Sequence, residues 1–554
     1  MRRKGRIINI VKENSAVRDT HAGRNFAEGA RAEKARVLAA LPQELADLHR
    51  AGVIHIHDLD GWNDVGNCST PLPESYLRPG LVRSKTDYGK IADVFEQVKS
   101  MIYTVGQRQT GGIGCGNFDR DMAAALVGCG VAPTDANFAA FREEAVRFFS
   151  GLSTHRLRNA CENFYVTLNM GLDTSEWGRA VTRESIAAFE SLPGDFTRPN
   201  IVFKVKRDIN GVGGVNHDLF QRACACTAKK MIPTYLLMDS KPNADCDPWL
   251  LNIMGCRTRV YANRNGNNGS VGRGNIAAVS VNLPRIALES QDVETFLTRL
   301  AEIMDAARRV LILRAETLKA SHYLAEVADS GCWHADNAED ICRQGTYSVG
   351  FIGVSEAVEM LGEDMLSTGG GVRLAENILE AMRGIVDGFS VATGLNFALL
   401  ASPGEGISGR FADEDSRRFP EAACWRKGFY TNSFHISVDS GVSIARKLSV
   451  EGPFHRFANG GSISYVELRE APIGNIEAIS DIVGLATACG VSYLGVNFPL
   501  DLCNECGTRG TFDVCPNCGS TSVKRIRRVS GYLEVLDEFA TGKKFEESLR
   551  RANG

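Results

Sequence analysis

The chain has 554 residues, of which 44% are hydrophobic and 23% are charged, and its formal net charge is −3. This composition is typical of a large folded enzyme; it excludes a disordered chain and argues against a general nucleic-acid or membrane-binding surface. No run reaches the ~18 apolar residues of a membrane helix, and no apolar segment follows the basic start at residues 1–10, as it would in a signal peptide. We therefore expect a cytoplasmic protein without membrane or nucleic-acid partners.

The predicted secondary structure alternates between helices and strands along most of the chain. Helices are predicted at residues 30–50, with a break at Pro42, and at 88–106, 135–150, 216–231 and 291–320. Strands are predicted at residues 54–57, 200–206, 234–238, 278–282, 348–353 and 432–438. The glycine-rich residues 263–275 are predicted to be a loop. This alternation predicts one large α/β assembly. The composition changes near Asp501, where a small cysteine-rich unit begins.

Four of the sixteen cysteines follow the spacing of a zinc ribbon. Cys503 and Cys506 form one Cys-x2-Cys pair, and Cys515 and Cys518 form a second pair after eight intervening residues. Two such pairs on a short hairpin can place four thiolates at the corners of a tetrahedron, which is the geometry of structural Zn²⁺. The other cysteines are scattered, which is typical of free thiols in a reducing cytoplasm rather than of a secreted disulfide scaffold.

Directly after this ribbon, residues 528–533 read Arg-Val-Ser-Gly-Tyr-Leu. One interpretation of Gly531 is a tight turn that needs positive φ. The other is radical chemistry, because a glycine Cα has no side chain and a radical there can flatten and delocalise into both flanking amides.

The Arg-Val-x-Gly-Tyr string resembles the radical loop of glycyl radical enzymes, and the preceding zinc ribbon narrows the resemblance to the anaerobic (class III) ribonucleotide reductases. The resemblance extends from about residue 30 to 545. It implies a ten-stranded α/β barrel of two antiparallel five-stranded halves with a finger loop over residues 1–500, without an N-terminal ATP cone. A zinc ribbon over 501–520 and a glycyl radical loop and tail over 521–554 complete the implied fold.

The resemblance also implies the catalytic groups. Gly531 carries the stored radical, and Cys256, in Ile-Met-Gly-Cys-Arg-Thr, carries the thiyl radical at the tip of the finger loop. Cys68, in Gly-Asn-Cys-Ser-Thr-Pro, delivers a proton and then a hydrogen atom at the 2′ carbon. Asn275 orients the substrate hydroxyls and formate. From the residues alone, the two cysteines would be buried thiols and Asn275 a cap between loop and strand.

Asn275 favours formate as the reductant over a thioredoxin-type dithiol. The dithiol route needs a cysteine that can pair with Cys68, and Cys115 and Cys161 are the two conceivable partners. The spacing of these residues does not decide between the two routes.

Several residues are predicted to line the substrate pocket. His55 and His57 alternate on one strand and thus share a face, which suits a metal site or a pocket wall; the resemblance favours the wall. The turn with Ser402, Gly404, Glu405 and Gly406 can open a helix whose backbone N–H groups attract phosphate, although a plain turn is the alternative. The resemblance adds two further pocket residues, Asn432 and Ser433.

As an anaerobic ribonucleotide reductase, the chain would reduce ribonucleoside triphosphates to 2′-deoxyribonucleoside triphosphates and so supply DNA precursors. The radical on Gly531 would be installed by a separate radical-SAM activase with a 4Fe–4S cluster, since this chain lacks a Cys-x3-Cys-x2-Cys motif. The resemblance further implies dNTP or ATP effectors near helical residues 88–110 and a homodimer.

Two other functions compete with this interpretation. A glycyl radical lyase or dehydratase would share the radical loop but usually not the zinc ribbon. A non-enzymatic zinc-ribbon protein that binds nucleic acid or protein is compatible with the basic residues 524–528. The near-neutral α/β body of about 500 residues argues against the second alternative.

Overall fold

The computed structural model describes residues 7–8, 17–18, 20–156, 163–529 and 531–554. Cys161 lies outside these residues. The two shortest N-terminal strands, β1 (Ile7–Ile8) and β2 (Val17–Arg18), pair only with each other. The rest of the chain is built around one large sheet.

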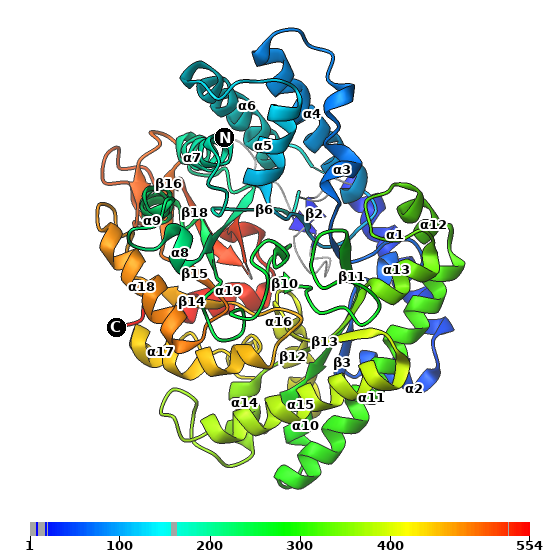
Figure 1. The fold of residues 1–554 in the computed structure, drawn as a ribbon. Coiled ribbons are helices and arrows are strands. Elements are labelled where there is room, and N and C mark those ends of the chain that lie inside the picture. Colours follow the sequence, from blue (N-terminus) through cyan, green and yellow to red (C-terminus); the bar gives the residue numbers. More distant parts are fainter. Residues whose placement is uncertain (1–6, 9–16, 19, 157–162, 530) are drawn as a thin grey trace.

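Ten strands of this sheet form two parallel halves of five strands each. Helices surround the sheet (Figure 1). The first half comprises β4 (Cys68–Thr70), β5 (Ile113–Cys115), β6 (Val166–Met170), β7 (Asn200–Val205) and β8 (Thr234–Leu237). The second half comprises β11 (Arg273–Asn282), β12 (Thr346–Ile352), β13 (Asn396–Ala401), β14 (Ser464–Glu467) and β15 (Tyr493–Asn497).

The two halves meet antiparallel, at β11 with β4 and at β15 with β8. The remaining edge, between β13 and β14, is bridged where Ala401 N donates to Gly461 O at 3.0 Å and Gly460 N donates to Leu399 O at 2.8 Å. An additional strand, β3 (Ile54–Ile56), pairs antiparallel with β11. The predicted barrel of two antiparallel five-stranded halves is therefore confirmed.

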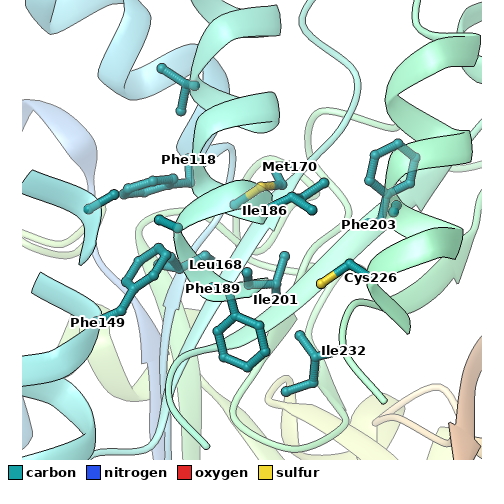
Figure 2. Packing of buried hydrophobic residues seen from close by; sticks show 14 of the residues in the cluster. Phe118, Phe149, Leu168, Met170, Ile186, Phe189, Ile201, Phe203, Cys226 and Ile232 are labelled. Carbon is teal, nitrogen blue, oxygen red and sulfur yellow. The ribbon is translucent and has the colours of Figure 1, made fainter. Parts of the chain in front are cut away.

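Helices cover the outside of both halves, each over its own apolar layer. Figure 2 shows the first layer, in which Phe149, Leu168 and Phe189 interlock. Its main helices are α4 (Asp87–Gly106), α5 (Phe118–Gly128), α6 (Asp135–Thr154), α7 (Glu176–Ser191), α9 (His217–Lys230) and α18 (Ile476–Cys489). The second layer is packed by α1 (His21–Ala40), α2 (Gln43–Arg50), α10 (Leu283–Leu288), α11 (Val293–Ala320), α12 (His322–Asp329), α13 (Ala338–Gln344), α14 (Val354–Met360) and α15 (Val372–Thr393).

Shorter or peripheral elements complete the described chain. They are α3 (Pro73–Tyr76), α8 (Arg207–Asn210), α16 (Ile407–Arg418), α17 (Ile444–Glu451), α19 (Thr541–Leu549) and the 3-10 turns η1 (Leu59–Gly61), η2 (Pro79–Leu81), η3 (Gly452–Arg456) and η4 (Leu536–Glu538). Over the described residues, every helix is too short or too polar to cross a bilayer.

A small hairpin and a four-stranded sheet complete the architecture. A small hairpin of β9 (Ile253–Met254) and β10 (Thr258–Arg259) contacts β4, β5 and β6 and is the predicted finger loop. The C-terminal sheet contains β16 (Leu500–Cys503), β17 (Arg509–Gly510), β18 (Val523–Val529) and β19 (Tyr532–Val535). Because β18 pairs with β16, residues on both sides of the predicted boundary at residue 520 share one sheet. The division into three domains stays a prediction.

Most predicted elements lie at nearly the predicted positions, and the predicted helix at 30–50 is indeed broken beside Pro42. The predicted strand at 432–438 is wrong. In that segment Ser433 has φ 44°, and the backbone N–H of Ile436 donates to the carboxylate of Glu451 rather than to a neighbouring strand. The predicted loop at 263–275 is too long, because β11 already begins at Arg273. The guanidinium of Arg273 fixes that start by donating to the carbonyl oxygens of Gly269 and Gln344.

Candidate active site

Two turns from distant parts of the chain meet inside the barrel. The finger hairpin turns at Gly255, which has φ 63°, and presents Cys256. The β18–β19 hairpin turns at Gly531, which has φ 122°. A Cβ placed on Gly531 would lie 2.6 Å from Cys256 O and 2.7 Å from Cys256 Cβ. Only a glycine fits at this contact, and its Cα directly faces the cysteine backbone.

Cys68 lies on the other side of the finger turn. A Cβ on Gly255 would be 3.2 Å from Cys68 Sγ, and the backbone N–H of Gly112 donates to the same sulfur at 3.2 Å. Both cysteines line one cavity. Its other polar or aromatic lining residues are His57, Asn67, Tyr165, Arg257, Thr258, Glu405 and Tyr532. The structure thus brings together Cys256, Cys68 and Gly531, which the sequence separates by up to 463 positions (531 − 68).

Both thiols are held in their protonated form. Burial raises the pKa of Cys256 to about 12 and the pKa of Cys68 to about 11. Removal from water disfavours the thiolate, and the nearby Arg257 offsets this only partly at Cys256. A neutral S–H group is a poor nucleophile but retains the hydrogen atom that a radical transfer requires. The site is therefore suited to hydrogen-atom chemistry rather than to nucleophilic attack.

Arg528 holds the glycine turn from one side. Its Nη1 donates to Gly531 O at 2.9 Å, its Nε donates to Asn497 Oδ1 at 2.7 Å, and its Nη2 donates to Met231 O. The side chain is only 3% exposed. The motif in the sequence includes this arginine without indicating its role, although its position three residues before Gly531 was a signal that could have been used.

On the opposite side, an aromatic and ionic clamp holds the residues after Gly531. The ring of Tyr532 lies 4.8 Å from that of Tyr165, and the guanidinium of Arg198 lies 5.3 Å from the Tyr532 ring. Arg198 also forms a buried ion pair with Glu534 at 3.0 Å and donates to Leu533 O at 2.6 Å. Sequence reasoning missed this clamp: Tyr532 stands in the glycyl radical motif, but nothing in the sequence links it to Tyr165, Arg198 or Glu534.

Asn275 lies in β11 directly opposite Cys68 in the antiparallel pairing. Its Nδ2 donates to Asn67 Oδ1 at 3.0 Å, and its Oδ1 accepts from Ser348 Oγ at 2.8 Å. It lines a second cavity beside the one that holds both cysteines, and both Asn67 and Cys68 line the two cavities. Asn67, which the sequence analysis did not predict, and Cys68 therefore connect Asn275 to the cysteine cavity.

The two histidines occupy different environments. His57 lines the cysteine cavity, and its Nε2 lies 2.8 Å from Ser280 Oγ, which in turn lies 2.6 Å from Ser402 Oγ. His55 Nδ1 lies 3.1 Å from the guanidinium of Arg410 instead. Within the described part of the chain, the histidines belong to no group of three or more metal-ligating side chains. The pocket-wall interpretation fits His57.

The predicted phosphate turn borders the same cavity. Glu405 faces it, and Gly406 is the N-cap of α16. Gly404 has φ 66°, and a Cβ there would lie 2.0 Å from Asn432 Oδ1, which accepts a hydrogen bond from Lys543 Nζ at 3.0 Å. Ser433 is buried, with no hydrogen-bond partner for its Oγ among the described atoms. Asn432 and the turn thus touch, and α19 contacts Asn432 and packs against α16, the helix that follows the turn.

The four ribbon cysteines converge as predicted, with all sulfur atoms within 4.8 Å of one another. Each pair forms a knuckle in which a glycine N–H donates back to the first cysteine carbonyl, from Gly507 to Cys503 at 3.0 Å and from Gly519 to Cys515 at 2.9 Å. Four thiolate ligands leave no open position, which is the arrangement of a structural zinc site. The residues present therefore fit Zn²⁺.

The described residues give no support to a second cysteine that could form a disulfide with Cys68. Cys115 is buried in the apolar layer outside the first half-barrel, whereas Cys68 packs with Met254 and Val260 beneath the finger. The other candidate, Cys161, lies outside the described residues.

The chain is similar to a family of known enzymes over almost its whole length. The family model described as anaerobic ribonucleoside-triphosphate reductase matches residues 13–552. The chain is 30% identical to the anaerobic ribonucleoside-triphosphate reductase of Escherichia coli (strain K12), covering 92% of this chain and 78% of that protein. It is 27% identical to the enzyme of Enterobacteria phage T4, covering 91% of each. The solved anaerobic ribonucleotide reductase from Thermotoga maritima in complex with dATP and CTP superposes with a TM-score of 0.73 at 16% identity, covering 96% and 90% of the two chains. At this identity, the superposition shows the fold alone.

Proposed function

The chain belongs to the family of anaerobic ribonucleoside-triphosphate reductases, and we propose that Gly531, Cys256 and Cys68 carry its radical reaction. As a member of this family it is an oxidoreductase that converts ribonucleoside triphosphates to 2′-deoxyribonucleoside triphosphates. The observation that carries the proposal is the contact between Gly531 and Cys256. Membership over residues 13–552 sets aside both the lyase and the zinc-ribbon binding protein.

The first step transfers a hydrogen atom between the two turns. A separate radical-SAM activase removes one hydrogen atom from Gly531 Cα, and the resulting radical is shared with both flanking amides. Cys256 then donates its Sγ hydrogen to Gly531 Cα, which restores the glycine and leaves the unpaired electron on sulfur. The raised pKa of Cys256 supports this step, because the hydrogen atom is present on the thiol at neutral pH.

The second stage takes place on the ribose. Cys256 removes the 3′ hydrogen, and Cys68 supplies a proton with which the 2′ hydroxyl leaves as water. Formate supplies two electrons and is oxidised to CO₂. Formate's hydrogen atom reaches the 2′ carbon by way of Cys68, and its second electron reduces the 3′ position. Cys256 then returns its hydrogen atom to the 3′ carbon, which regenerates the Cys256 radical, and one proton from solvent replaces the proton that Cys68 gave. Asn275 is proposed to orient the hydroxyls and formate, with Asn67 as its link to the cavity.

We also propose the remaining contacts of the substrate and effectors. His57 and Glu405 line the cavity, and Gly406, next to Glu405, is the N-cap of α16. These residues are proposed to hold the ribose and the triphosphate, the latter at the N-terminus of α16. The Thermotoga maritima reductase was solved in complex with dATP and CTP. By analogy, we propose dNTP or ATP effectors and a homodimer contact near α4, in a reducing cytoplasm.

Cys503, Cys506, Cys515 and Cys518 are proposed to hold structural Zn²⁺. When bound, the metal supplies a crosslink between the two knuckles and no reactive position. Cys503 ends β16, and β16 pairs with β18, which leads directly into the Gly531 turn. The ribbon therefore anchors β18, one strand of the β18–β19 hairpin that carries Gly531.

Replacing Cys503 by serine is expected to lower bound zinc to less than about a tenth of one ion per chain and the radical yield by about tenfold, because the β16 anchor is lost. The barrel should keep its circular-dichroism spectrum. Zinc is measured by mass spectrometry and the radical by EPR. Cys129→Ser, at a partly exposed cysteine that ends α5, is the matched control. Full radical yield without zinc would contradict the anchoring role.

The proposed function is tested by anaerobic EPR after treatment with an activase, SAM and a reductant. We expect a doublet that collapses to a singlet when glycine is deuterated at Cα. With CTP and formate, the activated protein should form dCTP and CO₂ in equal amounts. The absence of any signal with a verified activase would refute the radical assignment. Turnover with a dithiol but not with formate would refute formate as the reductant and leave the radical assignment intact.

A further inference from the structure

A chain of three buried polar side chains and one half-buried arginine leads from Gly531 to the C-terminal tail. Arg528 donates to Gly531 O and to Asn497 Oδ1. The Nδ2 of Asn497 donates to Glu467 Oε1 at 2.9 Å. Arg550, the residue that ends α19, donates to the same Glu467 oxygen at 2.6 Å. Four side chains thus connect the carbonyl of the radical glycine to a residue 19 positions further along the chain (550 − 531).

The tail is fixed at this point by more than one contact. Arg550 also pairs with Glu546 at 3.1 Å and with Glu547 at 2.8 Å. Asn553 binds the backbone of Glu467 on both sides, since its N–H donates to Glu467 O at 2.7 Å and its Oδ1 accepts from Glu467 N at 2.8 Å. Glu467 is the last residue of β14 and therefore belongs to the barrel. These contacts fasten the tail to the barrel wall.

The orientation of Asn497 is the critical link. Within the described chain, no ion pair joins Arg528 directly to a carboxylate, so the guanidinium relies on oxygen acceptors, one of which is Asn497 Oδ1. An ionised Glu467 can only accept hydrogen bonds, and it therefore requires the amide N–H₂ of Asn497 to face it and the amide oxygen to face Arg528. Arg550 is the cation that balances Glu467.

Loss of that cation would break the arrangement. Glu467 Oε1 would keep the Asn497 Nδ2 donor but lose the guanidinium of Arg550. A buried carboxylate is stable only beside a positive partner, and the charge of Arg528 already acts on Glu467. The carboxylate would be drawn toward Arg528 and displace the amide oxygen of Asn497, so Arg528 would lose the geometry that fixes Gly531 O.

We propose that Arg550 is a positioning residue for the radical glycine, and that it acts through Glu467, Asn497 and Arg528 to hold Gly531 against Cys256. This inference rests on the proposed function of Gly531 and adds a role for the tail. The same tail helix also lies near the proposed substrate end of the barrel, because Lys543 donates to Asn432 and a Cβ on Gly542 would lie 2.6 Å from the Cα of Gly409 in α16. The C-terminal segment thus contacts Asn432 and α16 as well as the residues that hold the Gly531 turn.

The test compares Arg550→Met with Arg551→Met in the full-length protein. Arg551 is the adjacent arginine, is exposed, and has no ion pair among the described residues. In the unactivated protein, hydrogen–deuterium exchange of the peptide that contains residues 528–533 should be about tenfold faster in Arg550→Met and unchanged in Arg551→Met. After activation, kcat should fall about tenfold with KM for CTP within about twofold, and Arg550→Lys should restore part of the loss.

Equal exchange in the two methionine variants would overturn the proposal, whatever their activities. If Arg550→Met fails to fold, Glu467→Gln decides: it keeps Arg550 but offers Asn497 a donor, and it should speed exchange at residues 528–533 by a similar factor. Unchanged exchange in Glu467→Gln would then overturn the proposal. A wild-type protein that forms no radical would refute the proposed function, while the exchange measurement would still decide whether Arg550 positions the Gly531 turn.

Discussion

Gly531→Ala is expected to abolish both the EPR doublet and turnover, with activity reduced by at least about 10³-fold, or ~4 kcal/mol of transition-state stabilisation. Two physical reasons combine. An alanine Cβ at this position would lie 2.6–2.9 Å from O, Cβ and Cα of Cys256, so the turn must move away from the cysteine. The φ of 122° is also strained for an L side chain by roughly 1–3 kcal/mol. The variant therefore loses both the radical position and the close approach.

The control for this experiment is Gly130→Ala. Gly130 also has positive φ, at 68°, but a Cβ there meets nothing within 4 Å. It reports the cost of backbone strain alone, and its radical and turnover should stay normal. A second measurement uses oxygen: air should cut the activated wild-type chain at Gly531 and release a short C-terminal peptide, and the alanine variant should stay intact. A normal doublet in Gly531→Ala would mean that the radical resides elsewhere.

The parts of the site that could be predicted from the sequence are those whose residues stand close together in a short motif. The zinc ligands follow from two Cys-x2-Cys pairs, and Gly531 stands in a five-residue string. The alternation of helices and strands predicts an α/β assembly but not its closure into a barrel. Closure depends on the pairing of β11 with β4 and of β15 with β8, between segments far apart in the chain. The barrel was predicted through the resemblance alone.

The wrong strand prediction and the missed contacts have a common cause: side chains from distant parts of the chain determine the backbone structure at these positions. The apolar alternation at 432–438 is typical of a strand, yet Glu356 binds the backbone N–H of Thr431 and Glu451 binds that of Ile436. The Arg198–Glu534 pair joins residues 336 positions apart. No window of sequence contains both members of such a pair, so neither could be recognised beforehand.

Cys256→Ser is expected to separate storage of the radical from its use. Serine is nearly isosteric, so the finger turn and its contact with Gly531 should persist, and the activase should still produce the Gly531 doublet at close to the wild-type yield. An alcohol O–H bond is much stronger than a thiol S–H bond, so transfer of that hydrogen to the glycine radical is strongly uphill. Turnover should fall by at least about 10³-fold, or ~4 kcal/mol.

Cys115→Ser is the matched control, because Cys115 is a buried thiol whose pKa is raised to about 12 by desolvation, as is that of Cys256. It should keep both the doublet and turnover, with a modest loss of stability from the buried hydroxyl of ~1–3 kcal/mol. Loss of turnover in Cys115→Ser would instead support a disulfide with Cys68 and the dithiol route.

The two site variants together establish the order of the two radicals. If Gly531→Ala shows no doublet and Cys256→Ser shows one, the radical forms first on Gly531 and then moves to Cys256. The reason is that a radical stored on Gly531 stays visible by EPR when its transfer to Cys256 is blocked. A doublet missing from Cys256→Ser would mean that the cysteine is needed to form the glycine radical, and the proposed order would be wrong.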